Sequence, residues 1–447
     1  MSRPDGVHVR ARASSISRRR FLNDAGWLTL SGLIGSAAVP RLSAAQPAAD
    51  FSSDDLALLD DLVRTGFRYF WEAAHPGTGL VKDRSRADGP DERTIASIAA
   101  TGFGLTALCL ADERRLGDRK QIRERVRMTL RYFWEQAEHQ RGFFYHFIHW
   151  ETGAREWKCE LSSIDTALLL GGVLTCRQHF ADREIRELAR KIYERVDWPW
   201  MMNDGSTLAM AWYPERGFLP NRWKAYCEHN LLYLLALGSP THPIPAAAWE
   251  AWERPRHEYE GLRYLGSDAP LFVHQFSHAW FDFRGRRDRH ADYFENSVTA
   301  TKVHLRFCTH LRVRFPKFGE DLWGITASDS AHGYTAWGGP PELGELDGSI
   351  VPCAAAGSLP FLPRETLRTL HFMRRQFGDQ IWKRYGFVDA FNPHNGWVNP
   401  DVIGIDVGIS MLMAENARNG FVWKTFMKNP EAGRALRRAG FVSTPRK

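Results

Sequence analysis

Apolar residues recur every three or four positions along most of the chain after residue 50, which is the spacing of one face of an α-helix. The first such segment follows Ser53 and Asp54, two residues that can cap a helix, and its apolar positions run from Leu56 to Phe70. Strand-like alternation is scarce, and residues 143–147 are its best, short example. The helical spacing returns in nine further segments: 96–112, 121–137, 164–179, 183–196, 228–237, 294–314, 364–377, 406–419 and 430–439.

Long segments rich in Gly, Pro, Trp and His separate these predicted helices. Residues 46–447 contain no long Gly/Ser-rich or Pro-rich linker, so we expect one domain there. Ten or more helices with long loops in one unbroken chain predict an all-α toroid, in which paired helices surround a central axis. The loops are the expected place for function, and they comprise 75–94, 141–160, 198–227, 254–293, 318–363 and 386–405.

Most of the net charge of +7 belongs to the first 45 residues. Seven arginines against Asp5 and Asp24 give this segment +5, which leaves +2 for the rest of the chain. The stretch 17–22, Ser-Arg-Arg-Arg-Phe-Leu, matches the twin-arginine export pattern, and the weakly apolar run 27–39 is shorter than the roughly 20 residues that a membrane span needs. We therefore predict a twin-arginine signal peptide at residues 1–45, a periplasmic protein, the twin-arginine export machinery as a partner and no stable membrane span.

The loops between the predicted helices are rich in tryptophan. An indole offers a flat apolar face and one N–H donor, which suits a pyranose ring. Stacking on single-stranded nucleic acid would require a strongly positive groove, and a nearly neutral body does not favour one. The composition thus predicts an oligo- or polysaccharide partner and no nucleic acid. For any single tryptophan of these loops, packing between helices is the alternative role. The loop tryptophans are Trp150, Trp157, Trp198, Trp200, Trp212, Trp223, Trp280, Trp323, Trp337 and Trp397.

Three acidic residues stand at the starts of predicted helices next to Trp-rich loops. They are Asp165, Glu228 and Asp406. Each could simply cap or begin its helix, because a carboxylate is favoured there by the helix dipole. In a toroid, however, the N-termini of the inner helices gather at the end of the cavity where the loops meet. Two carboxylates that face each other across a sugar are what glycoside hydrolysis requires.

Other chemistries find less support in the sequence. His274 and His278 have the i, i+4 spacing of metal ligands, but the glutamate of H-E-x-x-H is missing and no third ligand is evident. The six cysteines form no C-x-x-C pair, and the chain has neither a G-x-S-x-G elbow nor a phosphate-binding Gly-rich loop. We expect no metal and no cofactor.

The loops also carry a family resemblance, which extends through nearly the whole chain after the leader. The chain resembles the bacterial glycoamylase-like family, which includes endo-β-1,2-glucanases and the cyclising domain of cyclic β-1,2-glucan synthases. The residues that resemble the family are, in order, Gly66 to Glu72, His75-Pro76, Gly79-Leu80, Gly102 to Leu108, Leu237 to Pro243, Phe272 to Asp282, Asp292 to Asn296, Trp323 to Asp329, Gly333-Tyr334, Asp347-Gly348, Ala354 to Phe361, Gly386 to Pro393 and Gly404 to Asp406.

The resemblance implies an (α/α)6 toroid with a glycosidic cleft. It places Glu228 at an essential glutamate of the family and Asp406 at the aspartate of a G-I-D-x-G segment. Asp165 falls where relatives typically have glutamate, and Ser162 stands in place of an acid, with Glu160 as a candidate to compensate. The chain therefore departs from the family pattern in the segment around Ser162 and Asp165.

Together these observations predict a periplasmic glycoside hydrolase that cleaves β-glucan, most simply an endo-acting, inverting β-1,2-glucanase. Glu228 is the expected general acid, Asp406 the base and Asp165 a supporting carboxylate. A transglycosylase that cyclises or remodels the glucan, or a non-catalytic glucan-binding protein on the same fold, are the alternatives. The expected substrate-binding residues are Arg93, Trp223, Tyr226, His274, His278, Asp329, Tyr334, Trp337 and Trp397.

Overall fold

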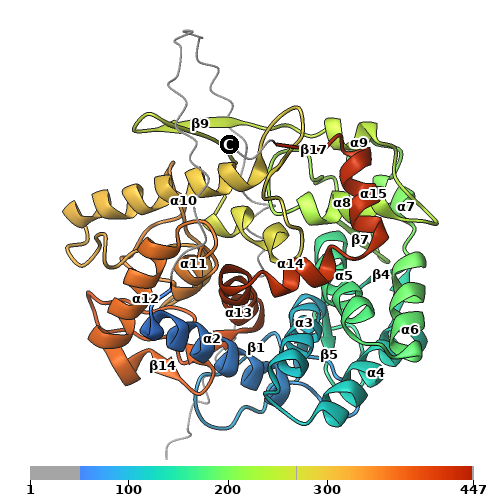
Figure 1. Cartoon of the computed structure of the whole chain (residues 1–447), viewed down its shortest axis with the longest axis horizontal. Helices are drawn as coiled ribbons and strands as arrows, with labels where there is room; N and C mark the ends of the chain where they lie inside the picture. Colours follow the sequence, from blue (N-terminus) through green and yellow to red (C-terminus); the bar gives the residue numbers. More distant parts are fainter. Residues whose placement is uncertain (1–50, 268, 445–447) are drawn as a thin grey trace, which may run out of the picture.

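Helices dominate the regular structure of residues 51–267 and 269–444, the part of the chain that the computed structural model describes (Figure 1). The predicted signal peptide at residues 1–45 lies outside the described residues. Within them, none of the helices combines the length and the apolar character that a membrane crossing requires.

One group of helices is amphipathic and buries a single face. In α4 (Arg119–Glu135) the buried positions Ile122, Val126, Leu130 and Phe133 recur every three or four residues, so one stripe of the helix faces the interior. The other helices of this kind are α2 (Ser53–Glu72), α6 (Arg183–Glu194), α10 (Tyr293–His310), α12 (Pro363–Phe377) and α15 (Pro430–Arg438).

A second group is buried on nearly all sides: α3 (Ile98–Arg114), α5 (Ser163–His179), α8 (Asn230–Gly238) and α13 (Gly404–Arg418). A helix that is apolar all round belongs to the interior of a protein. In Figure 1, α13 lies near the middle of the molecule, and it packs against α2 and α3, while α3 packs against α5. The helices thus form an inner set and an outer set.

Short helical segments complete the helical part. They are α7 (Trp198–Met202), α9 (Ala247–Glu250), α11 (Pro352–Ala356) and α14 (Phe421–Phe426), with the 3-10 turns η1 (Leu271–His274), η2 (Phe276–Ala279), η3 (Leu311–Val313) and η4 (Gly378–Gln380).

Short antiparallel strands connect the starts of three inner helices. Directly before α13, α3 and α5 come β16 (Asp401–Ile403), β2 (Ile95–Ser97) and β6 (Leu161–Ser162). The first pairs with β1 (Arg84–Arg86), the second with β5 (Phe147–His149), and the third with β7 (Ala211–Tyr213), which continues to β8 (Gly217–Phe218).

Two isolated bridges join these pairs into one series, which we call the strand belt. Lys82 bridges to Ala96 and Tyr145 bridges to Leu161, so the belt runs from β16 through β1, β2, β5 and β6 to β8. Gly404, the first residue of α13, donates its backbone N–H to the carbonyl of Asp83 over 2.7 Å. The belt therefore holds the N-terminal ends of α13, α3 and α5 together on one side of the molecule.

The remaining strands form small hairpins and pairs in the loops. They are β3 (His139–Gln140) with β4 (Phe143–Phe144), β9 (Arg256–Tyr259) with β10 (Leu262–Leu265), β11 (Arg286–Arg287) with β17 (Val442–Ser443), β12 (Ala327–Ser330) with β13 (Gly333–Ala336), and β14 (Trp382–Lys383) with β15 (Gly386–Phe387).

The predicted helix-rich fold is confirmed, with two corrections. First, small sheets occur in the predicted loops, so the fold is helix-rich rather than free of strands. Second, the cap of α2 is Ser52: its hydroxyl accepts from the Asp55 N–H over 3.1 Å, and Asp55 Oδ2 accepts from the Ser52 N–H over 3.0 Å. This reciprocal pair satisfies two backbone donors, so Ser53 and Asp54 lie inside the helix.

Candidate active site

The three predicted carboxylates all lie at the starts of inner helices. Asp165 is in the first turn of α5, Asp406 is in the first turn of α13, and Glu228 precedes α8 by two residues. Their exposed fractions are 7%, 8% and 2%. Because β6 and β16 lead from the strand belt directly into α5 and α13, the belt fixes the ends of the helices that carry Asp165 and Asp406.

Asp406 has a buried carboxyl neighbour, Asp389, which the sequence did not reveal. The two residues line the same cavity together with Tyr385 and Cys353. Burial raises the pKa of Asp389 well above its usual range, and the negative charges of Asp406 and Asp329 raise it further. A proton on Asp389, donated to Asp406, removes the repulsion between the two groups. This leaves the charge of the pair on Asp406.

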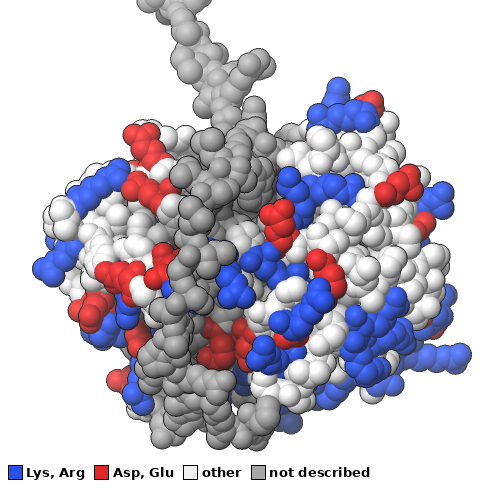
Figure 2. Space-filling view, turned by 90° about the horizontal axis from the view of Figure 1, so that it is seen from above, with Lys and Arg blue, Asp and Glu red and all other residues white. Residues whose placement is uncertain are grey.

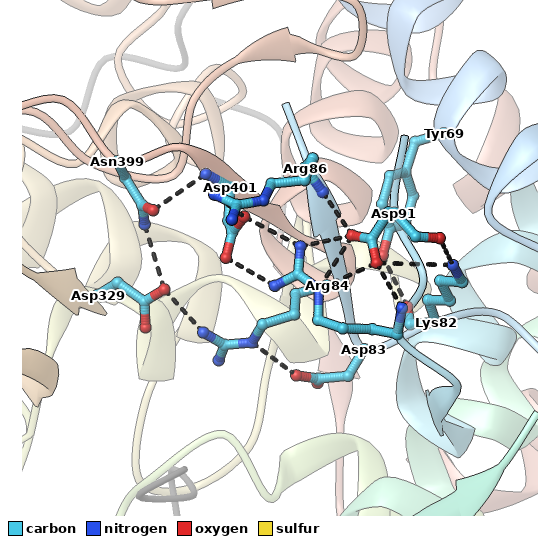
Figure 3. Close-up of polar contacts among 10 residues, drawn as sticks. Tyr69, Lys82, Asp83, Arg84, Arg86, Asp91, Asp329, Asn399 and Asp401 are labelled. Atoms are coloured by element: carbon cyan, nitrogen blue, oxygen red, sulfur yellow. Dashed lines mark hydrogen bonds and ion pairs between the residues drawn. The ribbon is translucent and has the colours of Figure 1, made fainter. Parts of the chain in front are cut away.

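A hydrogen-bond network fixes Asp389 from behind. Its Oδ2 accepts from the Asp329 backbone N–H over 2.9 Å and from Asn399 Nδ2 over 3.3 Å. Asn399 Nδ2 also approaches Asp329 Oδ2 over 3.2 Å, and the same oxygen accepts from the Arg84 guanidinium over 2.7 Å (Figure 3). Asp329 was predicted to bind substrate. In the structure its carboxylate engages Arg84, and its backbone holds Asp389.

Arg93, another predicted substrate-binding residue, belongs to a neighbouring ion-pair group. Its guanidinium donates to Asp401 over 2.7 and 3.0 Å and to Asp91 over 2.5 to 3.1 Å. Asp401 is the first residue of β16, which leads into α13. Arg93 thus anchors the strand that positions Asp406, and it acts on the candidate site through the backbone.

Glu228 is held by hydrogen bonds to both its side chain and its backbone carbonyl. The Cys227 thiol donates to Glu228 Oε2 over 2.5 Å. The Ser277 hydroxyl donates to the Glu228 carbonyl over 2.6 Å and accepts from the Leu231 N–H at the start of α8 over 2.8 Å. The 3-10 turn η2, which contains Ser277, also packs against α13. This turn therefore links the segment of Glu228 to the helix of Asp406.

Asp165 is surrounded by polar groups of the strand belt. Ser162 caps α5, because its hydroxyl accepts from the Asp165 N–H over 2.9 Å, and it also hydrogen-bonds to Asp165 Oδ2. His146 Nε2 lies 3.6 Å from Asp165 Oδ1, and His146 Nδ1 lies 3.0 Å from Glu160 Oε1. Glu160, the residue that the sequence suggested as a compensating acid, is thus connected to Asp165 through an imidazole.

Three aromatic residues predicted to contact substrate lie inside the protein. Trp223 is 1% exposed, and its indole N–H donates to the Ser163 hydroxyl over 2.9 Å. Tyr226 is 1% exposed and Trp337 is 2% exposed. Their ring faces are covered by other side chains in this structure, so we assign no sugar-stacking role to these three residues.

His274 and His278 are buried and neutral. Burial lowers the pKa of each imidazole to about 3. His274 Nδ1 is 3.2 Å from the Tyr226 hydroxyl, and His278 Nε2 is 3.0 Å from the Ser297 hydroxyl. The two histidines therefore take part in separate hydrogen bonds of the interior.

The remaining predicted contacts, Tyr334 in β13 and Trp397 in the loop before β16, are half-buried. Their binding roles stay predictions. Among the tryptophans of the described residues, Trp157 is the most exposed, with 53% of its surface accessible.

Comparison with known proteins agrees with this architecture. The family model described as Glycoamylase, putative glucoamylase, matches residues 220–430. The crystal structure of a putative glucoamylase from Bacteroides fragilis is 31% identical, with a TM-score of 0.79, and the match covers 90% of this chain and 100% of that one. The chain belongs to the glycoamylase family.

Two further proteins that are similar to this chain are named for an activity. An endo-β-1,2-glucanase from Chitinophaga pinensis, solved with sophorotriose and glucose, is 29% identical with a TM-score of 0.82, over 87% of this chain and 99% of that one. An exo β-1,2-glucooligosaccharide sophorohydrolase from Parabacteroides distasonis is 27% identical over 94% of this chain. The chain spans 64% of the length of this curated relative.

Proposed function

We propose that this glycoamylase-family chain is a glycoside hydrolase that cleaves β-glucan, and β-1,2-linked glucan in particular, from within the chain. The observation that carries the proposal is the set of buried carboxyl groups at the starts of α5, α8 and α13, with Asp406 and the buried Asp389 lining one cavity. The named activities of the two relatives support the choice of substrate.

In the proposed reaction Glu228 donates its proton to the glycosidic oxygen as the bond to the anomeric carbon breaks. A water molecule attacks the anomeric carbon from the other face, and Asp406 accepts the proton of that water, directly or through a substrate hydroxyl. Asp406 suits the role of the base because its neighbour Asp389 holds the proton of the pair. We expect inversion, so that β-glucan gives the α-anomer first, which NMR of fresh product measures.

Charge distribution supports an uncharged substrate. After the leader the chain has a net charge of only +2. On the face shown in Figure 2, acidic side chains lie among the basic ones on both sides of the molecule. A binding groove for a polyanion would require a concentration of positive charge.

We also propose that the helices form an (α/α)6 toroid. The division into inner helices buried all round and outer helices with one buried face supports this arrangement. The strand belt would then lie at the end of the toroid where the substrate enters.

The leader supports export through the twin-arginine route to the periplasm, which we propose on the Ser17–Leu22 motif alone. Replacing both Arg18 and Arg19 by Lys should leave the precursor uncleaved in the cytoplasm, and fractionation of cells that express the chain checks this.

The function is tested by incubating the mature protein with linear β-1,2-glucan and measuring new reducing ends. Glu228→Gln should lower kcat by about 10²- to 10⁴-fold with unchanged folding, because the amide cannot donate the required proton. Glu253→Gln, at an exposed glutamate in the loop before β9, is the matched control and should retain full activity. Full activity in Glu228→Gln would overturn the residue assignment. Wild-type protein that releases no ends from a panel of β- and α-glucans would overturn the hydrolase itself.

Product sizes separate the related activities. An endo-acting hydrolase releases oligosaccharides of mixed length from the start of the reaction, whereas an exo-acting one releases a single short product. A cyclising transglycosylase gives products whose mass lacks the added water, so mass spectrometry distinguishes it from both.

A further inference from the structure

His146 lies between two buried carboxylates at the strand belt. Its Nδ1 is 3.0 Å from Glu160 Oε1, and its Nε2 is 3.6 Å from Asp165 Oδ1. The three residues are 5% to 7% exposed. The His146 N–H donates to the Glu160 carbonyl over 3.0 Å, and the His146 carbonyl accepts from the Ile98 N–H at the start of α3 over 3.2 Å. The imidazole is therefore positioned by the backbone on both sides.

One histidine and two carboxylates are also a potential set of metal ligands, and these three residues offer ligand atoms within 4.8 Å of one another. His146 Nδ1, however, already lies 3.0 Å from Glu160 Oε1, and the other oxygens of the two carboxylates accept from the Ser162 and Tyr213 hydroxyls. Both carboxylates are thus engaged by hydrogen-bond donors of the protein, which a cation would have to displace. The arrangement fits a proton better than a metal ion.

We propose that Glu160, His146 and Asp165 form a proton relay, in which His146 is a positioning residue that orients Asp165 and exchanges a proton with it. This inference rests on the proposed function, and it takes Asp165 as the supporting carboxylate that the sequence analysis expects. The proton leaves Nε2 of the imidazolium and binds Asp165 Oδ1, and the neutral imidazole keeps its Nδ1–H toward Glu160. The return step reverses this transfer, and Glu160 remains charged throughout, which stabilises the imidazolium.

The relay accounts for the departure of this chain from its family pattern. Asp165 is one methylene shorter than the glutamate that the resemblance implies, and Ser162 stands in place of an acid. In the structure the Ser162 hydroxyl engages Asp165 Oδ2 while His146 faces Oδ1. Both oxygens of the shorter side chain therefore have a protein neighbour, and the negative charge of Glu160 reaches Asp165 through the ring.

The other titratable groups around the relay do not compete with these three residues for the proton. From β7, the Tyr213 hydroxyl donates to Glu160 Oε2 over 3.4 Å. Burial raises the pKa of the Cys159 thiol to about 12, so this neighbour of His146 stays neutral. The nearest arginine of the same loop, Arg155, forms a bidentate pair with Glu215. The positive charge of Arg155 is thus largely neutralised by Glu215, which lies outside the relay.

Kinetics test the relay in the active enzyme. His146→Gln should lower kcat on β-1,2-glucan by about 10²-fold with less than a threefold change in KM, and should flatten one limb of the pH profile of kcat/KM. His149→Gln, three residues along the same segment in β5, is the matched control and should leave both unchanged. Added imidazole should restore part of the kcat of His146→Ala, which a purely structural role would not allow.

A second measurement does not depend on activity, so it separates failure of the relay from failure of the proposed function. NMR of the ring nitrogens follows the titration of His146 in the folded protein. Glu160→Gln and Asp165→Asn should each lower its midpoint by at least one pH unit, because each removes a negative charge that favours the imidazolium.

Several outcomes would overturn the proposal. One is a His146 midpoint that neither carboxylate variant moves. Another is a His146→Gln enzyme with wild-type kcat and pH profile, or a folded His146→Ala enzyme that imidazole does not rescue. Loss of activity on EDTA treatment, with recovery on adding Zn²⁺ alone, would replace the relay by a metal site.

Discussion

Asp389 is 4% exposed, and the charges of two other carboxyl groups, of Asp329 and Asp406, act on it. Such a group is tolerated only when it is neutral, since isolated buried charge is costly. A neutral Asp389 can donate to Asp406 while its Oδ2 accepts from the Asp329 N–H and Asn399. Asp389 and Asp406 are chemically identical side chains, and the position of one proton makes Asp389 the donor and Asp406 the charged acceptor.

Asp389→Asn tests this protonation through stability. The raised pKa of Asp389 means that its contribution to folding is fully present below the unfolded value near 4 and is lost as pH rises toward the folded value. The amide imitates the protonated acid and has no such loss. We expect the variant to gain on the wild type by up to about 1.4 kcal/mol per pH unit above pH 4, measured by urea unfolding from pH 4.5 to 7.5. A difference that does not change with pH would mean that Asp389 is ionised.

The position of a carboxylate at a helix start could be inferred from sequence, and Asp165, Glu228 and Asp406 all lie there. Asp389 was not singled out, although it lies in the family-like segment 386–393, because it is in an irregular loop and only packing brings it to Asp406. Composition could not distinguish a tryptophan on a binding surface from one in the interior: Trp223 is 1% exposed and Trp157 is 53% exposed.

At the scale of the elements, hydrophobic spacing predicted the longer helices to within a few residues. The segment 183–196, for example, corresponds to α6 at Arg183–Glu194. The short helices α7 and α11 and the strands of the belt were not predicted, because elements of two to five residues contain too few positions to show a period. The belt strands β16, β2 and β6 are stabilised by pairing with β1, β5 and β7, which lie far from them in the sequence.

The contact between α3 and α5 depends on two glycines, since the backbones of these helices approach closely. A Cβ on Gly172 would lie 2.0 Å from the Gly102 carbonyl oxygen, and neither backbone can move aside easily. Gly172→Ala should therefore destabilise the protein by about 1–3 kcal/mol or more, measured as a lower urea midpoint.

Gly433→Ala in α15 is the matched control. A Cβ there would meet only the end of the Arg437 side chain, at 3.5 Å. Alanine loses less conformational entropy than glycine in a helix, so this variant should gain about 0.5–1 kcal/mol. Equal effects of the two substitutions would show that the close approach of α3 and α5 is not required.

For the whole molecule, the interior combines many buried polar groups with a large apolar core, and this determines how it responds to acid. Burial lowers the pKa of His229, His274 and His278 to about 3, and that of His304 to about 4. Each imidazole therefore stays neutral in the folded protein at pH values where the unfolded chain binds a proton.

The stability that these four histidines allow is complete above the unfolded pKa near 6.5 and is lost as pH falls from there toward 3 or 4. Each histidine contributes a slope of about 1.4 kcal/mol per pH unit to the free energy of unfolding in this range. The neutral Asp389 has a slope of the opposite sign, which offsets part of one histidine's contribution. Since a domain is stable by about 5–15 kcal/mol, we expect cooperative acid unfolding between about pH 5 and 3. Urea midpoints from pH 7 to 4.5 should fall steadily.

His229→Phe should make this fall less steep. Both ring nitrogens of His229 lack a hydrogen-bond partner within the described residues, and its ring packs edge-on against Trp252 at 4.7 Å between centroids. Phenylalanine keeps the ring contact and removes the titration, so the variant should gain on the wild type by up to about 1.4 kcal/mol per pH unit below 6.5. His242→Phe, at an exposed histidine, should follow the wild-type slope. A His229→Phe curve parallel to the wild type would show that burial of this imidazole does not drive the acid sensitivity.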